Sequence, residues 1–269
     1  MTAAPPQPVL AHDRGGPSGA VPVVLLHAGV ADRRMWDPQW AALTAVRDTA
    51  RPDLRGFGGS GTPPTGPLDH VADVVALLDG LGIERAHLVG ASFGAGVAAT
   101  VAVTHPERVA SLLLAPPGGA LLTELTGDLQ DFLAAERQAL ADDDLDAATE
   151  ANIAAWVVGP GRHASAVDPA VVDAVRTMQR AVFVLGETWP EDVDELEPDP
   201  PVTERLDEIA CPTTVLVGGH DLETSRAAAD LVEGLVAGAR RVDWPDVAHL
   251  PSMERPDEFT ALLLAHLPD

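Results

Sequence analysis

The 269-residue chain contains no lysine and no tyrosine, and it has a single cysteine. Its 17 cationic side chains are therefore all arginines, set against 41 aspartates and glutamates, for a formal net charge of −24. Nucleic acids and anionic membranes bind to cationic surfaces, so this charge balance argues against both as partners. The lone Cys211 permits neither an intramolecular disulfide nor a cysteine-based metal cluster, and we expect it to be an inert core residue.

Long apolar runs are absent as well, although 46% of the residues are hydrophobic. No stretch is apolar over a length that would cross a bilayer, and residues 1–6 lack the basic and hydrophobic regions of a signal peptide. We therefore expect a cytoplasmic protein. The length suits one α/β domain with an insertion, and the hydrophobic content suits a substantial core.

The most informative segment contains the pattern G-x-S-x-G, with Ser92 at its centre, between a predicted buried strand and a predicted helix. Such a sharp strand-to-helix turn exposes the serine hydroxyl. Gly90 and Gly94 are expected because side chains there would collide with the neighbouring strand and helix. The amide of Phe93 would lie at a helix N-terminus, where unpaired N–H groups and the helix dipole favour an oxyanion. The segment therefore predicts a nucleophilic serine.

A serine nucleophile needs a base, and the base needs a carboxylate that fixes its tautomer. The β-branched run 213–217 predicts a buried strand that leads into Asp221, and His249 precedes the last predicted helix. The order serine, acid, histidine along the chain is the one that this turn motif requires. Asp221 could instead cap the helix that follows it, His249 could be a surface loop residue, and His220 is the main rival for the base.

The apolar run 21–26 predicts another buried strand, and the loop after it is where a second oxyanion donor should come from. An acyl-transfer site needs this second backbone N–H beside that of Phe93. Gly29 and Val30 are the candidate donors, of which Gly29 is favoured. His27 is expected to pack and to hydrogen-bond beneath the loop.

A glycine-rich segment, residues 53–61, follows a further short strand. We interpret it as a tight scaffold turn with an internal pair between Asp53 and Arg55. This turn would brace the mouth of the site.

Predicted strands and helices alternate through most of the chain. This alternation predicts an α/β fold with a mostly parallel, doubly wound sheet, formed by residues 1–119 and 208–269. Residues 120–207 interrupt the alternation. Helices are predicted inside this insertion over residues 125–141, 145–157 and 169–185.

Together these segments resemble the α/β-hydrolase superfamily from about Val21 to the C-terminus. The matching pieces are His27-Ala28-Gly29, Asp53-x-Arg55-Gly56, Gly90-x-Ser92-x-Gly94, Gly218-x-x-Asp221 and His249-Leu250-Pro251. Within the superfamily, the chain is similar to small bacterial esterases and to enol-lactonases of the 3-oxoadipate type. The resemblance implies that the insertion forms a helical cap over Ser92, which by analogy shapes the substrate pocket and excludes water.

We therefore expect a serine hydrolase without metal or cofactor that cleaves a small carboxylic ester or lactone through an acyl-enzyme. Ser92, Asp221 and His249 would form the catalytic triad, and the amides of Phe93 and Gly29 the oxyanion hole. The negative charge favours a neutral substrate, although cations in the loop after Gly29 could bind an anionic one. Candidate residues for such a cation or for the substrate pocket are Val30, Arg33, Arg34, Trp156 and Phe183.

Other functions stay open, because fold and triad do not choose a substrate. The same triad could serve a carbon–carbon bond hydrolase or a cofactor-free haloperoxidase or perhydrolase. A protein of another class, a non-enzymatic small-molecule sensor, could also keep these residues. The expected partner is a small molecule, and the sequence is compatible with a homodimer.

Overall fold

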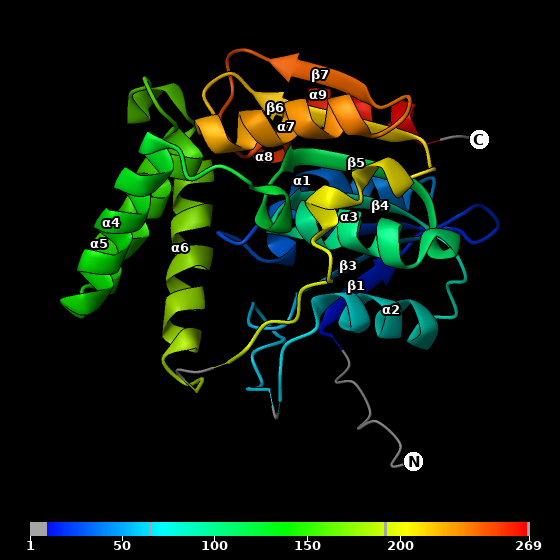
Figure 1. The fold of residues 1–269 in the computed structure, drawn as a ribbon, viewed down its shortest axis with the longest axis horizontal. Helices are drawn as coiled ribbons and strands as arrows, with labels where there is room; N and C mark the ends of the chain where they lie inside the picture. The colour runs from blue at the N-terminus through cyan, green and yellow to red at the C-terminus, as the bar shows by residue number, and fades with distance from the viewer. Residues whose placement is uncertain (1–9, 65, 191–192, 268–269) are drawn as a thin grey trace.

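The computed structural model describes residues 10–64, 66–190 and 193–267, which are organised around a central sheet (Figure 1). Within these ranges, seven strands pair in the order β1-β3-β2-β4-β5-β6-β7. They are β1 (His12–Gly15), β2 (Val23–Leu26), β3 (Thr49–Pro52), β4 (Ala86–Ser92), β5 (Val109–Pro117), β6 (Thr213–Gly218) and β7 (Arg240–Trp244). β1 runs antiparallel to β3 and the other pairs are parallel, so the predicted α/β fold is confirmed. Residues 1–6, expected to lack a signal peptide, lie outside the described ranges.

Helices cover both faces of the sheet. The α-helices outside the insertion are α1 (Asp37–Thr44), α2 (His70–Gly80), α3 (Phe93–Thr104), α7 (Glu223–Leu235), α8 (Pro251–Glu254) and α9 (Pro256–His266). Short 3-10 turns are η1 (Arg33–Trp36), η2 (Pro106–Arg108), η3 (Gly119–Leu121), η5 (Ala164–Ala166), η6 (Val202–Glu204) and η7 (Leu206–Glu208). None of the helices in the described part of the chain has the length and apolarity needed to cross a membrane.

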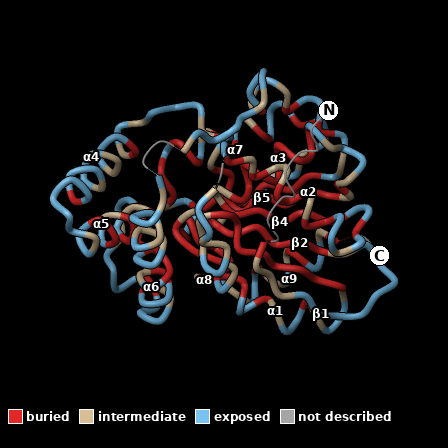
Figure 2. The backbone as a smooth tube through the Cα atoms, turned by 90° about the horizontal axis from the view of Figure 1, so that it is seen from below, coloured by how far each residue is buried: buried red, intermediate tan, exposed pale blue. Residues whose placement is uncertain are grey.

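Alternate residues of the buried strands pack into two separate hydrophobic clusters, one on each face of the sheet. Val24 and Leu26 of β2 join the cluster beneath α2, α3 and α7, whereas Val23 and Leu25 join the cluster on the opposite face. This division follows from the strand period of two, since successive side chains point to opposite faces. Because both faces of β2 are covered, its residues form a continuous apolar run rather than an alternating one. Figure 2 shows the buried strands at the centre of the molecule, inside a largely exposed outline.

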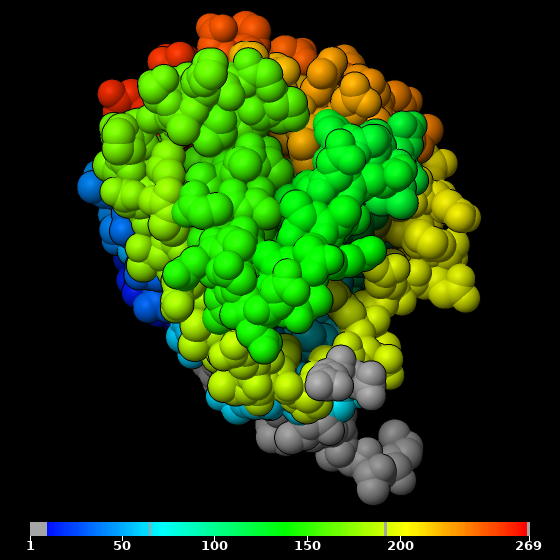
Figure 3. Space-filling view, turned by 90° about the vertical axis from the view of Figure 1, so that its left-hand side faces the viewer, coloured from blue at the N-terminus to red at the C-terminus, as the bar shows by residue number. Residues whose placement is uncertain are grey.

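The insertion between β5 and β6 forms three helices beside the sheet. They are α4 (Gly127–Ala141), α5 (Leu145–Asn152) and α6 (Pro169–Gly186). α5 continues into a π-helical segment, η4 (Ile153–Val158), so the predicted helix over 145–157 consists of two helix types. The three helices stand apart from the strands in Figure 1 and spread across one face of the molecule in Figure 3.

Local sequence signals set where these helices begin. Asp144 and Asp168 precede α5 and α6, and each side chain accepts a hydrogen bond from a backbone N–H of the first turn. Such caps satisfy N–H groups that have no partner within the helix. Pro169 follows as the first residue of α6, where its fixed φ suits a helix start.

Candidate active site

Ser92 lies where β4 turns sharply into α3, at the carboxyl edge of the sheet. Its φ of 51° and ψ of −113° place it in a conformation that residues other than glycine rarely adopt. A Cβ on Gly90 would lie 2.4 Å from the carbonyl oxygen of Gly94, and one on Gly94 would lie 2.4 Å from that of Leu26. Only glycine fits at either position, so the reason predicted for both glycines is confirmed.

A third glycine packs directly against the serine. Gly118 follows β5, and a Cβ there would lie 2.9 Å from Ser92 Oγ. A side chain at this position would occupy the space beside the hydroxyl. Gly118 belongs to none of the motifs recognised in the sequence, so local pattern could not have found it.

The structure brings Asp221 and His249 into direct contact. His249 Nδ1 lies 2.7 Å from Asp221 Oδ1 and 2.8 Å from Oδ2, and both residues are buried. A carboxylate only accepts hydrogen bonds, so Nδ1 carries the proton and Nε2 presents its lone pair. Nε2 has no hydrogen-bond partner among the described residues, and no hydrogen bond joins it to Ser92. The imidazole therefore has the tautomer that a general base requires.

The competing interpretations of these residues are not supported. The N-cap position of α7 is occupied by Leu222, so Asp221 does not cap that helix, and His249 is buried rather than on the surface. His220 faces the insertion, because its Nδ1 lies 3.1 Å from the carbonyl oxygen of Pro160.

His27 fixes the loop that follows β2. Its Nε2 accepts a hydrogen bond from Leu54 N–H at 2.9 Å, so Nδ1 carries the proton and donates to the carbonyl of Ala28 at 2.9 Å. Burial lowers the pKa of His27, which keeps the ring neutral. The carbonyl of His27 also accepts from Gly94 N–H at 3.1 Å. The predicted packing role of His27 is therefore confirmed.

This loop presents backbone amides beside the serine. Ala31 N–H bonds back to the carbonyl of Ala28, whereas Gly29 and Val30 donate to no acceptor in the described part of the chain. A Cβ on Gly29 would lie 3.5 Å from Phe93 Cβ, so this glycine faces the start of α3. Phe93 is the first residue of that helix, where amides lack partners within the helix.

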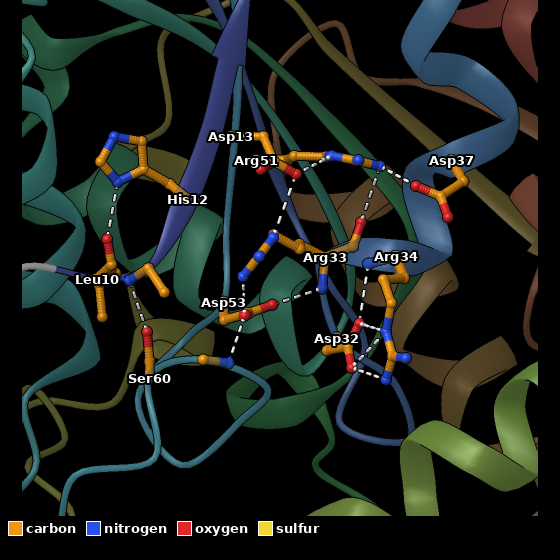
Figure 4. Close-up of polar contacts among 12 residues, drawn as sticks. Leu10, His12, Asp13, Asp32, Arg33, Arg34, Asp37, Arg51, Asp53 and Ser60 are labelled. Carbon is orange, nitrogen blue, oxygen red and sulfur yellow. Dashed lines mark hydrogen bonds and ion pairs between the residues drawn. The ribbon is translucent and has the colours of Figure 1, made fainter.

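Arg33 follows this loop in the sequence, and Figure 4 shows that it belongs to a polar network with Asp13 and Asp53. Its backbone N–H donates to Asp53 Oδ1 at 2.8 Å, and its guanidinium pairs with Asp53 and, at 3.2 Å, with Asp13. Arg55 pairs with Asp73 of α2. The predicted internal pair between Asp53 and Arg55 is wrong, because among the described residues each of them pairs with a side chain outside the glycine-rich turn.

A cleft of about 900 Å³ lies between this network and α6. Arg33 and Arg34 line it, but none of Ser92, Asp221 and His249 does. Arg34 is paired with Asp32 at 2.6 Å, and Asp32 and Asp53 are buried. The positive charge of both arginines is therefore balanced at close range by buried carboxylates.

Of the predicted pocket residues, Trp156 lies against the histidine. Its ring centroid is 4.4 Å from that of His249, and the ring of Phe132 also packs edge-on against it at 5.3 Å. Val30 is buried in the same core cluster as Trp156. Phe183 is half-buried on α6 and makes no ring contact with the described aromatic residues or histidines. Phe132 was not predicted, because its approach depends on how α4 packs against η4.

A sharp turn with a strained serine, a buried carboxylate–imidazole pair and a loop of unpaired amides all follow the carboxyl ends of parallel strands of the sheet. The sequence profile of the α/β hydrolase fold family matches residues 21–256, and the chain belongs to this family.

Proteins with described activities resemble this chain to different extents. It is 42% identical over 123 residues to the dihydrolipoyllysine-residue acetyltransferase component of the acetoin cleaving system of Pseudomonas putida. The aligned segment covers 45% of this chain and only 33% of that protein. It is 25% identical to 3-oxoadipate enol-lactonase 1 of Acinetobacter baylyi over 91% of this chain and 87% of that protein. The solved structure of Est816, an N-acyl homoserine lactone degrading enzyme, superposes with a TM-score of 0.75 at 26% identity and covers 96% of both chains.

Proposed function

We propose that the protein is a serine hydrolase that cleaves a small carboxylic ester or lactone. The observation that carries this proposal is the buried pair of Asp221 with His249 Nδ1, which leaves Nε2 without a partner. The strained Ser92 turn and the similarity to a lactonase and to a lactone-degrading enzyme support it.

In the proposed mechanism, His249 Nε2 takes the proton of Ser92 Oγ as the oxygen attacks the carbonyl carbon. The amides of Phe93 and Gly29 donate to the oxyanion, and Asp221 stabilises the imidazolium that forms. His249 then returns the proton to the leaving alkoxide, which gives an acyl-enzyme on Ser92. Water activated by His249 hydrolyses this acyl-enzyme and releases the acid.

The charges around the site favour a neutral substrate. The chain carries a net charge of −24, and the two arginines after the oxyanion loop are paired with buried carboxylates. An anionic ester would meet repulsion, and the charges of these two arginines are already balanced by their carboxylates. This preference can be tested with a neutral and an anionic ester of similar size, such as ethyl butyrate and monoethyl succinate. At low salt, kcat/KM should be higher for the neutral ester. A higher kcat/KM for the anionic ester would contradict the predicted preference.

We further propose that residues 120–207 act as a cap that shapes the pocket and excludes water. The core cluster on one face of the sheet continues into this segment through Trp156, Val157 and Met178. This shared packing supports a cap that is held against the sheet domain. The distance between the sheet edge and the cap helices would then set the size of the acyl or alcohol group.

The function is tested by reaction with a fluorophosphonate and by hydrolysis of p-nitrophenyl acetate and butyrate, with the wild type and Ser92→Ala compared. We expect covalent labelling at Ser92, multiple turnovers, and a loss of at least ~10³-fold in kcat in the variant without a change in folding. The rate should fall on the acid side, because a protonated His249 cannot accept a proton. Turnover that survives Ser92→Ala would refute the proposal. Labelling without turnover would favour a carbon–carbon hydrolase or a sensor.

A further inference from the structure

One segment of the insertion, residues 156–162, touches both loops that carry Asp221 and His249; we call it the cap base. Its first contact is with the histidine itself. The carbonyl of Trp156 accepts a hydrogen bond from His249 N–H at 3.2 Å, and the two rings lie 4.4 Å apart at 48°. Trp156 therefore restrains both the backbone and the ring of His249.

The second contact is with the loop before Asp221. Gly159 ends η4 with a φ of 81°, and a Cβ there would lie 2.2 Å from the carbonyl oxygen of His220 and 2.8 Å from Ala248 Cβ. The backbone of the cap base is therefore wedged between the two loops. The π-helical turn explains this close approach. A π-helix has a wider turn than an α-helix, so the end of η4 is shifted relative to a continued α5, and Gly159 lies against the two loops.

The third contact is a buried ion pair. Arg162 Nη2 donates to Glu254 Oε2 at 2.7 Å, and the side chains are only 7% and 5% exposed. Glu254 Oε1 accepts the N–H of Ala248, the residue before His249, at 2.7 Å. The carboxylate thus joins the cap base on one side to the His249 loop on the other.

This pair differs from the ion pairs of Arg176 and Arg180 on α6. Arg176 and Arg180 pair with carboxylates that are more than half exposed, namely those of Glu150, Asp173 and Asp146. Exposed pairs of that kind contribute little, whereas a buried charge requires its partner because removing one leaves the other unsolvated. The Arg162–Glu254 pair is therefore a buried ionic link between the cap base and the His249 loop.

We propose that Arg162 and Glu254 are positioning residues for His249, holding its loop at the place from which Nε2 reaches Ser92. This inference rests on the proposed function. Neither side chain takes part in proton transfer. Both side chains act indirectly, by holding the backbone at Ala248 and by keeping the ring of Trp156 against the imidazole of His249.

The test compares Arg162→Met, Glu254→Ala and Glu254→Gln with the wild type, and Arg180→Met serves as a control that removes an exposed cap arginine. In Arg162→Met and Glu254→Ala, kcat for p-nitrophenyl butyrate should fall on the order of 10²-fold with KM little changed, because a small displacement of the base affects the reacting geometry. Their pH–rate profiles should also shift. Glu254→Gln keeps an acceptor for Ala248 N–H but loses the ion pair with Arg162, so its kcat should lie between those of Glu254→Ala and the wild type. Arg180→Met should behave as wild type.

If single variants do not fold, the double variant Arg162→Met/Glu254→Gln leaves no unpaired buried charge and is judged by the same criteria. A folded Arg162→Met or double variant with wild-type kcat and pH profile would overturn the inference. Turnover that survives Ser92→Ala would instead overturn the proposed function. In that case the positioning role is tested without an activity assay, by following the NMR signals of the His249 ring as a function of pH. A titration curve of His249 that changes in Arg162→Met supports the role, and an unchanged curve overturns it.

Discussion

Acidification should destabilise this fold through histidines that are buried as neutral rings, of which His70 and His87 are two. His70, the first residue of α2, packs its ring edge-on against Phe93 at 4.9 Å. His87 lies in β4, with Nδ1 at 2.8 Å from Ser111 Oγ. Their exposed fractions are 5% and 3%, and burial lowers the pKa of each from 6.5 to about 4.

The sign follows from proton uptake. Because the pKa of each histidine is lower in the folded state, the unfolded chain binds more protons between pH 6.5 and 4, and stability falls as the pH drops through this window. A gap from 6.5 to about 4 corresponds to roughly 3 kcal/mol per histidine below pH 4, and to about 2 kcal/mol at pH 5. The two histidines together should therefore lower the free energy of unfolding by up to about 4 kcal/mol between pH 8 and pH 5.

Urea unfolding of wild type and His87→Gln at pH 8 and pH 5 measures this effect. Glutamine can still hydrogen-bond to Ser111 but does not titrate, so the variant should lose about 2 kcal/mol less than the wild type over the same pH change. His163→Gln, at an exposed position, is the matched control and should follow the wild type. An equal loss in His87→Gln and wild type would refute the reasoning.

Two further substitutions test the packing around the site. Gly94→Ala would place a Cβ 2.4 Å from the carbonyl oxygen of Leu26, so we expect a loss of about 2 kcal/mol or more in unfolding free energy together with loss of fluorophosphonate labelling; normal labelling would contradict the predicted clash. Arg55→Met would leave the buried Asp73 without its guanidinium and should cost about 3–5 kcal/mol by urea unfolding. Arg205→Met, which breaks an exposed pair, should leave the midpoint unchanged, and similar losses in both variants would show that burial is not the deciding factor.

Strands, helices and the elbow could be predicted from the sequence because their signals are local. The apolar run of β2, the glycines around Ser92 and the aspartate after β6 each depend on residues within a few positions of one another. The sheet then brings Asp221 to His249, since the carboxyl ends of parallel strands share one edge. Chain order was therefore sufficient to predict this contact.

Polar pairing was predicted less well, because it depends on approaches between distant segments. Asp53 and Arg55 are neighbours in sequence, yet each finds a better-placed partner in η1 or α2. Arg162 and Glu254 are 92 positions apart, and no spacing rule connects them. The π-helical form of η4 was missed for a related reason, since the apolar pattern over 145–157 is compatible with either helix type.

The contact between the rings of Trp156 and His249 also gives the molecule a fluorescence signal beside the proposed catalytic base. The chain has five tryptophans and no tyrosine, so its near-ultraviolet emission comes from indole alone. Only Trp156 among them lies in ring contact with a histidine in the described part of the chain. A protonated imidazole at this distance quenches indole emission, so the part of the fluorescence that Trp156→Phe removes would follow the charge of His249 in real time, without an added label.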